Sequence, residues 1–267
     1  MNGYGFLRQP RWLALGFLVL VIVPSFFALS RWQLNRLDQR RYENALVLGH
    51  SSQTPQPLDN VMKAGSPNTS VGDPQRWVPV IATGTYDSSH QQLVRKRPLD
   101  GSNGFWVATP LVTTSGAVVV VNRGWIAAAG GATAVQDVPP PPSGVVTVTG
   151  RVQPSEDGPH PQPADLPAGQ ITELDISLFA SPAAAIYPGS VELISSVPAQ
   201  PAGLTPLPEP DLSDGPHLGY ALQWILFAII AVGGFVMLAR REREYSSEDD
   251  NADPALEESG ASPSDVG

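Results

Sequence analysis

The chain has 267 residues, 42% of them hydrophobic, and a formal net charge of −9 at pH 7. Nine Asp and Glu residues lie between Glu242 and the C-terminus, so most of the excess charge belongs to a tail, and nothing suggests the clustered basic surface of a nucleic-acid-binding protein. Cysteine is absent, which excludes disulfides, thiolate metal sites and cysteine nucleophiles, and three methionines offer little to a soft copper site.

The first predicted element is an apolar helix over residues 12–29, preceded by residues 1–11, which carry Arg8 and Arg11. No charged residue interrupts this helix, which is long enough to cross the core of a bilayer. A basic start followed by an apolar run is also typical of a signal peptide. We expect a retained anchor, because the run is longer than most signal-peptide cores and Ala28-Leu29-Ser30 is a poor cleavage site.

A charged helix is predicted to continue from this anchor as a stem over residues 30–48. Trp32 lies at the expected membrane interface, with four arginines close to it: Arg31, Arg36, Arg40 and Arg41. An aromatic belt with arginines that reach lipid head groups explains this pattern. A basic collar for acidic groups of a partner or cofactor is the alternative.

Residues 49–75 are rich in Ser, Pro, Gly, Asn and Gln and predict a loop. Beyond them, short segments rich in Val, Thr, Ile and aromatic residues alternate with turn sequences, which is typical of a mainly β domain. The predicted strands are 77–86, 92–97, 105–112, 117–125, 145–153 and 191–197, with a strand end and a helical turn within 171–180. The apolar run 118–121 predicts a strand buried on both faces.

A second apolar helix is predicted over residues 218–239, followed by an acidic tail, 240–267, which has little to bury and is expected to be disordered. An arginine cluster begins at Arg240, so the positive-inside rule places the C-terminus in the cytoplasm. Two spans put both termini on that side. The predicted fold is a plasma-membrane protein with two transmembrane α-helices that flank a mainly β (α+β), barrel- or sandwich-like, extracytoplasmic domain over residues 30–217.

No catalytic pattern is found in the predicted domain. Its histidines, His50, His90 and His160, each lie in a loop or at a strand edge, and the sequence has no G-x-S-x-G elbow, H-E-x-x-H helix or P-loop. Ser88, Ser89 and His90 lie too close together along one turn to form an acyl-transfer triad. We therefore predict that the protein is not an enzyme.

The segment Asn122-Arg123-Gly124-Trp125 ends the most apolar predicted strand. In one interpretation Gly permits a bend, Trp packs over a sheet edge and Arg satisfies loop carbonyls. In the other, Arg and Trp form a surface for a protein partner or an anionic cofactor. The sequence leaves both open, and the nearby basic segment Arg95-Lys96-Arg97 slightly favours the second.

The second apolar helix opens on Pro216 and His217, where Pro suits a first helical position. One face is predicted to carry His217, Tyr220, Ala221, Trp224, Ala228 and Ala231. This face is aromatic near water and small deeper down, so another helix or a flat ring could approach it closely. A helix N-terminus also favours neutral imidazole, the form that ligates metals. An interfacial belt without a ligand is the alternative.

Motifs in these segments follow one another in an order that points to a known family. They are Arg31-Trp32-Gln33-Leu34-Asn35-Arg36, Gly84-Thr85-Tyr86-Asp87, Arg97, Gly104, Thr109-Pro110-Leu111, Val119-Val120-Val121-Asn122-Arg123-Gly124-Trp125 and His217-Leu218-Gly219-Tyr220-Ala221-Leu222-Gln223-Trp224. They resemble the Surfeit locus protein one family, membrane proteins that assist assembly of haem–copper cytochrome c oxidase.

The resemblance implies a role in maturing oxidase subunit I, around insertion or stabilisation of haem a, with cytochrome c oxidase subunit I and haem a synthase as partners. In bacterial relatives, haem a binding is associated with the histidine of the second-anchor motif, and this role carries over to His217. Tyr220 and Trp224 would then line the ring, and Arg31 or Arg36 would meet the propionates.

Two other functions stay open. One is a haem-free scaffold that holds an oxidase subunit or a neighbouring respiratory complex through the Arg123 and Trp125 strand end and the small-residue helix faces. The other is an envelope-facing binding module unrelated to respiration. The chain also departs from the family pattern in its Pro-rich loops, in its acidic tail, and in Gly215-Pro216, where relatives often carry polar amides.

Overall fold

The computed structural model describes residues 5–65, 70–130, 134–179 and 184–252. The chain divides into two compact units. One is a helical unit of residues 1–42 and 213–267, and the other is a β unit of residues 43–212.

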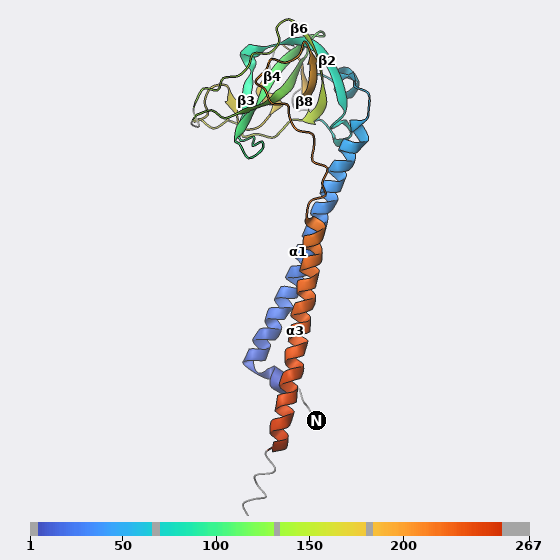
Figure 1. Ribbon diagram of the computed structural model, residues 1–267, viewed down its shortest axis with the longest axis vertical. Helices are drawn as coiled ribbons and strands as arrows, with labels where there is room; N and C mark the ends of the chain where they lie inside the picture. Colours follow the sequence, from blue (N-terminus) through green and yellow to red (C-terminus); the bar gives the residue numbers. More distant parts are fainter. Residues whose placement is uncertain (1–4, 66–69, 131–133, 180–183, 253–267) are drawn as a thin grey trace, which may run out of the picture. The chain divides into compact units, whose positions relative to one another are not determined.

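The helical unit is built from α1 (Pro10–Ser51), whose last turns belong to the β unit, and α3 (His217–Ala252), with a short 3-10 helix η1 (Gly5–Arg8) before α1. Both long helices contain a stretch that is long and apolar enough to cross a membrane (Figure 1). The predicted anchor and stem thus form one uninterrupted helix. Pro24 lies inside α1, and helices that cross a membrane tolerate proline.

Within the helical unit, the buried positions of each helix are separated by about whole numbers of helical turns and so lie along one face. On α1 they are Trp12, Ser30, Gln33 and Leu37, and on α3 they are Ala221, Ala228 and Ala239. Alanines at the α3 contact let the backbones approach closely. Large apolar side chains on the remaining faces are exposed, among them Phe17 at 67% and Ile229 at 63%, as expected where a helix faces lipid rather than water.

The prediction of a disordered tail from residue 240 is wrong for residues 240–252, because α3 continues to Ala252. A helix that already exists extends with one new hydrogen bond per residue and needs no new nucleus, and Arg and Glu are good helix formers. Arg241 also bonds Tyr245 one turn on, with 3.2 Å between Nη2 and the hydroxyl oxygen. The rest of the predicted tail, 253–267, lies outside the described residues.

Five strands close a barrel in the β unit (Figure 1). They are β2 (Pro79–Tyr86), β4 (Gly104–Thr113), β5 (Val118–Ala127), β6 (Val145–Pro154) and β8 (Ile186–Val197). Around the barrel the order is β2-β6-β8-β5-β4, and β4 returns to β2. β5 and β8 are parallel and the other neighbours antiparallel. This is the Greek-key topology of an OB-fold, so the barrel alternative of the prediction is the one observed.

Side-chain alternation explains the barrel core. On β6, Val146, Val148 and Val152 are fully buried while the residues between them face outward. Inward side chains of the other strands complete the cluster, which includes Val80, Leu111, Val119, Val121, Tyr187 and Val191. Gly84 permits the closure of β2 on β4, because a Cβ there would lie 2.2 Å from the Val112 carbonyl oxygen.

The outer face of β5 is also buried, and the predicted two-faced burial is confirmed for Val119, Val120 and Val121. Two further apolar clusters cover β4 and β5. Their members come from β3 (Gln92–Val94), β7 (Gln170–Ile171), the turn η4 (Ile176–Phe179) and the Pro-rich segments around Val138 and Leu204. OB-folds bind oligonucleotides on this side of the barrel, and here the chain itself covers it.

The predicted loop 49–75 is partly ordered, which corrects the sequence interpretation. It contains the end of α1, β1 (Gln56–Pro57), the one-turn helix α2 (Leu58–Val61) and the turn η2 (Asp73–Gln75). Leu58 and Met62 are 4% and 2% exposed and belong to the barrel core. A single turn with two apolar side chains four residues apart is too short to give a periodic signal.

Three other boundaries bear on the prediction. β8 begins at Ile186 and not at residue 191 as predicted. The prediction missed its first residues because they include Pro188 and Gly189, which normally weaken a strand. β3 ends at Val94, before Lys96, whose positive φ of 56° breaks the extended path. The strand end and turn predicted within 171–180 are present as β7 and η4.

Candidate functional site

His217 is the first residue of α3, and its ring contacts α1. Nδ1 lies 2.9 Å from Oε1 of Gln33, which is 9% exposed. A carbonyl oxygen only accepts hydrogen bonds, so this contact suits the neutral tautomer that has its proton on Nδ1 and its lone pair on Nε2. Metal-binding histidines are commonly oriented in this way, with the second ring nitrogen held by an oxygen acceptor.

Gly215 leaves space beside this free nitrogen. Its φ is +67°, and a Cβ at this position would lie 3.4 Å from both Cδ2 and Nε2 of His217. A side chain would therefore lie in van der Waals contact with the Nε2 edge of the ring and cover part of it, and the backbone conformation itself favours glycine. Glycine at position 215 thus leaves the Nε2 edge of the His217 ring uncovered.

The prediction that one face of α3 carries His217 together with an aromatic end and small residues open to a flat ring is only partly correct. Ala221 and Ala228 are 2% and 3% exposed and pack against α1, so the small residues meet a helix and leave no room for a flat ring there. Trp224 stacks on Phe26 of α1, with 5.5 Å between ring centroids. Tyr220 is 48% exposed, because the 4-3-4 spacing of His217, Ala221, Trp224 and Ala228 leaves it beside the buried stripe.

Arg123 is a buried cation on β5, 3% exposed, and no carboxylate pairs with it among the described residues. It donates hydrogen bonds from Nε to Oε1 of Gln200 at 2.8 Å, from Nη1 to Oε1 of Gln91 at 2.9 Å, and from both Nη atoms to the carbonyl oxygen of Pro139 at 3.2 Å. These acceptors belong to three segments that cover the barrel, so Arg123 ties all three to β5.

Tyr86 lies beneath this guanidinium, whose Cζ is 5.6 Å from the ring centroid. Burial lowers the pKa of Arg123 and raises the pKa of Tyr86 to about 12, with the Arg123 charge partly opposing the rise. Both groups therefore keep their usual protonation states at neutral pH. The arrangement stabilises the fold and leaves Arg123 inaccessible to a ligand.

The rest of the Asn122-Arg123-Gly124-Trp125 motif also holds segments together. The Trp125 indole donates to the Arg97 carbonyl oxygen at 2.6 Å, and its backbone exchanges two 2.8 Å hydrogen bonds with Thr205. Gly124 has φ +140°, and a Cβ there would lie 2.7 Å from the Thr205 carbonyl oxygen. Asn122 accepts a 3.4 Å hydrogen bond from the Gly124 amide. The structural interpretation therefore accounts for the motif, and Trp125, 8% exposed, offers no partner surface.

Arg97, the other motif arginine of the barrel, is held by a different set of partners. Nη2 pairs with Glu156 and, at 2.8 Å, with Glu173, and the guanidinium lies 4.1 Å from the centroid of the Trp106 ring. Glu156 and Glu173 flank the Pro-rich loop. Arg97, which follows β3 in the chain, therefore ties this loop to the end of β3.

Sequence comparison agrees with the order of these motifs. The profile of the SURF1 (Surfeit locus protein one) family matches residues 20–229. An uncharacterized SURF1-like protein of Mycobacterium bovis is 32% identical over 246 residues, which cover 91% of this chain and 88% of the relative, and one of Mycobacterium tuberculosis matches equally. A SURF1-like protein of Dictyostelium discoideum is 28% identical over 115 residues, covering 42% of this chain and 43% of the relative.

The chain belongs to the SURF1 family. This family is generally linked to cytochrome oxidase assembly, and the two apolar helices of this member are consistent with a membrane location. Gln33 and His217, which come from family motifs 184 residues apart, are brought into direct contact.

The other SURF1 motif residues of the helical unit do not join this pair. Trp32 is 57% exposed, Gln223 is exposed, and Arg36 donates from Nη1 to Oε1 of Gln39 at 3.0 Å. Trp32 and Arg36 are thus exposed on α1, and their interfacial role stays a prediction.

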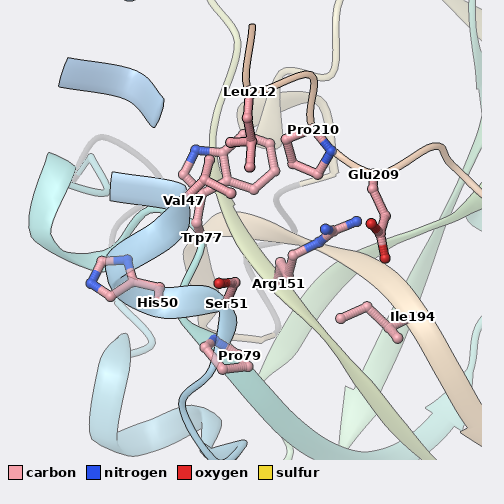
Figure 2. A pocket seen from close by; sticks show the side chains of 10 residues that line it. All are labelled: Val47, His50, Ser51, Trp77, Pro79, Arg151, Ile194, Glu209, Pro210 and Leu212. Atoms are coloured by element: carbon pink, nitrogen blue, oxygen red, sulfur yellow. The ribbon is translucent and has the colours of Figure 1, made fainter. Parts of the chain in front are cut away.

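A cavity of about 310 Å³ at the rim of the barrel was not predicted (Figure 2). It is lined by Val47, His50, Ser51, Trp77, Pro79, Arg151, Ile194, Glu209, Pro210 and Leu212. Trp77 has a strained φ of 70° and lies between Arg76 and Arg151, whose Cζ atoms are 5.6 and 5.7 Å from its ring centroid. The cavity therefore joins the end of α1, the barrel and the segment that leaves it.

An ion pair supports this rim, with Nη2 of Arg151 2.7 Å from Oε1 of Glu192. Burial raises the pKa of Glu192 above its ordinary value of 4.5, and Arg151 opposes the rise. Because the folded pKa is the higher one, the contribution of Glu192 to stability is complete below about pH 4.5 and declines as the pH rises through the folded pKa.

Replacing Arg151 with Met is expected to lower the free energy of unfolding by about 1–3 kcal/mol at pH 7, because the ionised Glu192 loses its partner. The loss should shrink as the pH falls towards 4.5, where Glu192 becomes neutral. Urea unfolding of the full-length protein in neutral detergent, followed by tryptophan fluorescence, measures both. The control is R151M combined with E192L, which removes both charges and should recover stability. An equal loss at both pH values would contradict the interpretation.

Proposed function

We propose that this SURF1 family member is a membrane-embedded assembly factor for haem–copper cytochrome c oxidase, which assists insertion of haem a into subunit I or its stabilisation there. The observation that carries the proposal is the hydrogen bond between Gln33 and His217. It joins two family motifs in one place, and when Nδ1 is the donor it leaves the Nε2 lone pair for a ligand. Family membership supplies the link to the oxidase.

The residues around His217 fit a single bond from its imidazole to a haem iron. When bound, haem a would supply an iron that accepts the imidazole lone pair. Gln33 keeps the proton on Nδ1, and Gly215 keeps the Nε2 edge open. Trp224 is already engaged by Phe26 and Phe227, so Tyr220 is the aromatic side chain exposed enough to contact a ring.

The proposed location is the cell membrane, with the β unit outside and both termini in the cytoplasm. The arginines that follow the apolar part of α3 support this orientation, since positively charged residues concentrate on the cytoplasmic side. The oxidase subunit I and haem a synthase, which share the bilayer, are the proposed partners.

The proposed role is binding and transfer without catalysis. Two sets of described residues bring Asp, His and Ser together: Asp175, His160 and Ser177, in which Asp and Ser both contact Nε2 of His160, and Asp87, His90 and Ser89. In the second set, both neighbours likewise contact the same ring nitrogen of His90, Asp87 at 2.6 Å and Ser89 at 3.2 Å. A catalytic relay needs the two ring nitrogens to face different partners, so neither set is arranged as one, and the second serves as the cap of a short turn.

A deletion strain tests the proposal. We expect its membranes to lose most of the haem a absorbance band and the wild-type gene to restore it. Protein purified from cells that make haem a should carry the haem, and His217→Ala should lose it because the iron loses its ligand. A normal band in the deletion strain would contradict the oxidase role. Equal haem in wild type and H217A would contradict the ligand role alone.

A haem-free scaffold is the second candidate, favoured by the large exposed apolar faces of both helices. It predicts that oxidase co-purifies equally with wild type and H217A, and that substitutions on an exposed face, such as Phe17→Ala, abolish the association. Trp125 cannot test it, because its loss would disturb the core of the β unit.

A further inference from the structure

A second site lies in the helical unit, far along both helices from His217, where α1 begins and α3 carries its arginines. A cavity of about 350 Å³ separates the two helices there. Its lining comes from both helices: Arg11, Trp12, Leu15, Leu238, Arg241, Glu242 and Tyr245. One part of the lining is apolar and the other is charged, so the cavity suits an amphipathic ligand with an apolar part and a charged group.

The charged part has one cation without an acidic partner. Arg11 forms an ion pair with Glu242 across the cavity. Arg241 bonds only the neutral hydroxyl of Tyr245, at 3.2 Å, and lies 5.6 Å from the centroid of its ring. No carboxylate pairs with Arg241 in the described part of the chain. Its guanidinium is therefore available to an anion, for which it offers several parallel donors.

The apolar part contains a buried donor without an acceptor. Trp12 is 7% exposed and its ring is held by Phe6 and Phe235, at centroid distances of 5.0 and 6.0 Å. Its indole N–H is buried and has no hydrogen-bond acceptor among the described residues. Leaving such a buried donor unsatisfied is unfavourable. An oxygen-bearing ligand in the cavity would remove this penalty.

We infer that this cavity binds the head group of an anionic phospholipid. The phosphate would pair with Arg241, an oxygen of the lipid would accept from Trp12, and the chain would lie along Leu15 and Leu238. Basic pockets between membrane helices are suited to anionic head groups, and this one lies where the apolar stretch of α3 meets its arginines. The inference rests on the proposed membrane location but not on the haem role.

The test uses full-length protein in neutral detergent, mixed with equal amounts of phosphatidylglycerol and phosphatidylcholine, with bound lipid counted by native mass spectrometry. We expect phosphatidylglycerol to be preferred. Arg241→Gln should reduce its binding at least about tenfold, since a hydrogen bond to a charged group is lost. Trp12→Phe, which keeps an aromatic side chain but removes the indole N–H, should reduce binding several-fold.

Arg240→Gln is the matched control, because it removes the same charge one residue away, outside the cavity. It should bind phosphatidylglycerol as the wild type does. Equal binding of the two lipids, or equal losses in R240Q and R241Q, would overturn the site. Displacement by glycerol phosphate would instead show a site for free phosphate and overturn the lipid assignment. If R241Q loses helical circular dichroism, its lipid binding reports misfolding. The binding of phosphatidylglycerol by W12F then tests the site. The haem role is tested separately, by comparing the haem content of wild type and H217A. Failure of the lipid site and failure of the haem role can therefore be told apart.

Discussion

Replacing Arg123 with methionine is expected to lower the free energy of unfolding of the β unit by about 3–5 kcal/mol, since buried acceptors that lose a donor cost about 1–3 kcal/mol each. The acceptors are Gln91, Pro139 and Gln200. Each belongs to a segment that covers β4 or β5, so their release should also expose the apolar clusters beneath. Urea unfolding of the full-length protein, followed by far-ultraviolet circular dichroism, measures the change.

Two variants control this prediction. Arg123→Lys keeps the charge but cannot direct donors to three acceptors at once, so it should lie between wild type and R123M. Arg95→Met removes an arginine for which no side-chain bond was found among the described residues, and it should change stability by less than about 0.5 kcal/mol. If R123M unfolds at the wild-type midpoint, Arg123 does not hold the covering segments.

Local patterns were enough to predict the strands of the barrel. The alternation of Val146, Val148 and Val152 with outward residues gives β6, and the continuous apolar run gives the doubly buried part of β5. Closure was not predictable, because it depends on Gly84 meeting Val112, a contact that no local period encodes. The sequence therefore left barrel and sandwich as alternatives.

The candidate site also depends on contacts between residues far apart in the sequence, which local patterns do not predict. The sequence singled out both Gln33 and His217, but it gave no sign that they touch across 184 residues. It also left the role of Arg123 open, because its partners lie 16, 32 and 77 positions away. Tyr220 lies beside the buried stripe of α3 and not within it, since the packing of α1 selects which stripe is buried. Residue types in the sequence were enough to select the candidate site residues. Which of these residues contact one another depends on tertiary packing, which the sequence pattern does not show.

Replacing Gln33 with leucine is expected to weaken retention of haem a about 10–100-fold, the usual effect of losing the group that orients a ligating histidine. Without the Gln33 oxygen, the His217 ring can rotate and the proton can move to Nε2, which removes the lone pair from the open edge. The measurement is the haem a absorbance per purified protein, together with the pH at which bound haem is released. This prediction rests on the proposed function.

Gln33→Glu separates orientation from packing, because its carboxylate still accepts from Nδ1 and should keep most of the haem. Gly215→Ala tests the other side of the ring, where a Cβ would lie 3.4 Å from Nε2, and should reduce haem content although His217 and Gln33 remain. If Q33L kept wild-type haem content and release pH, the hydrogen bond would serve helix packing alone. If Q33L and G215A both lost haem while Q33E kept it, the acceptor on Nδ1 and the open edge at Nε2 would be the two features that make His217 a ligand.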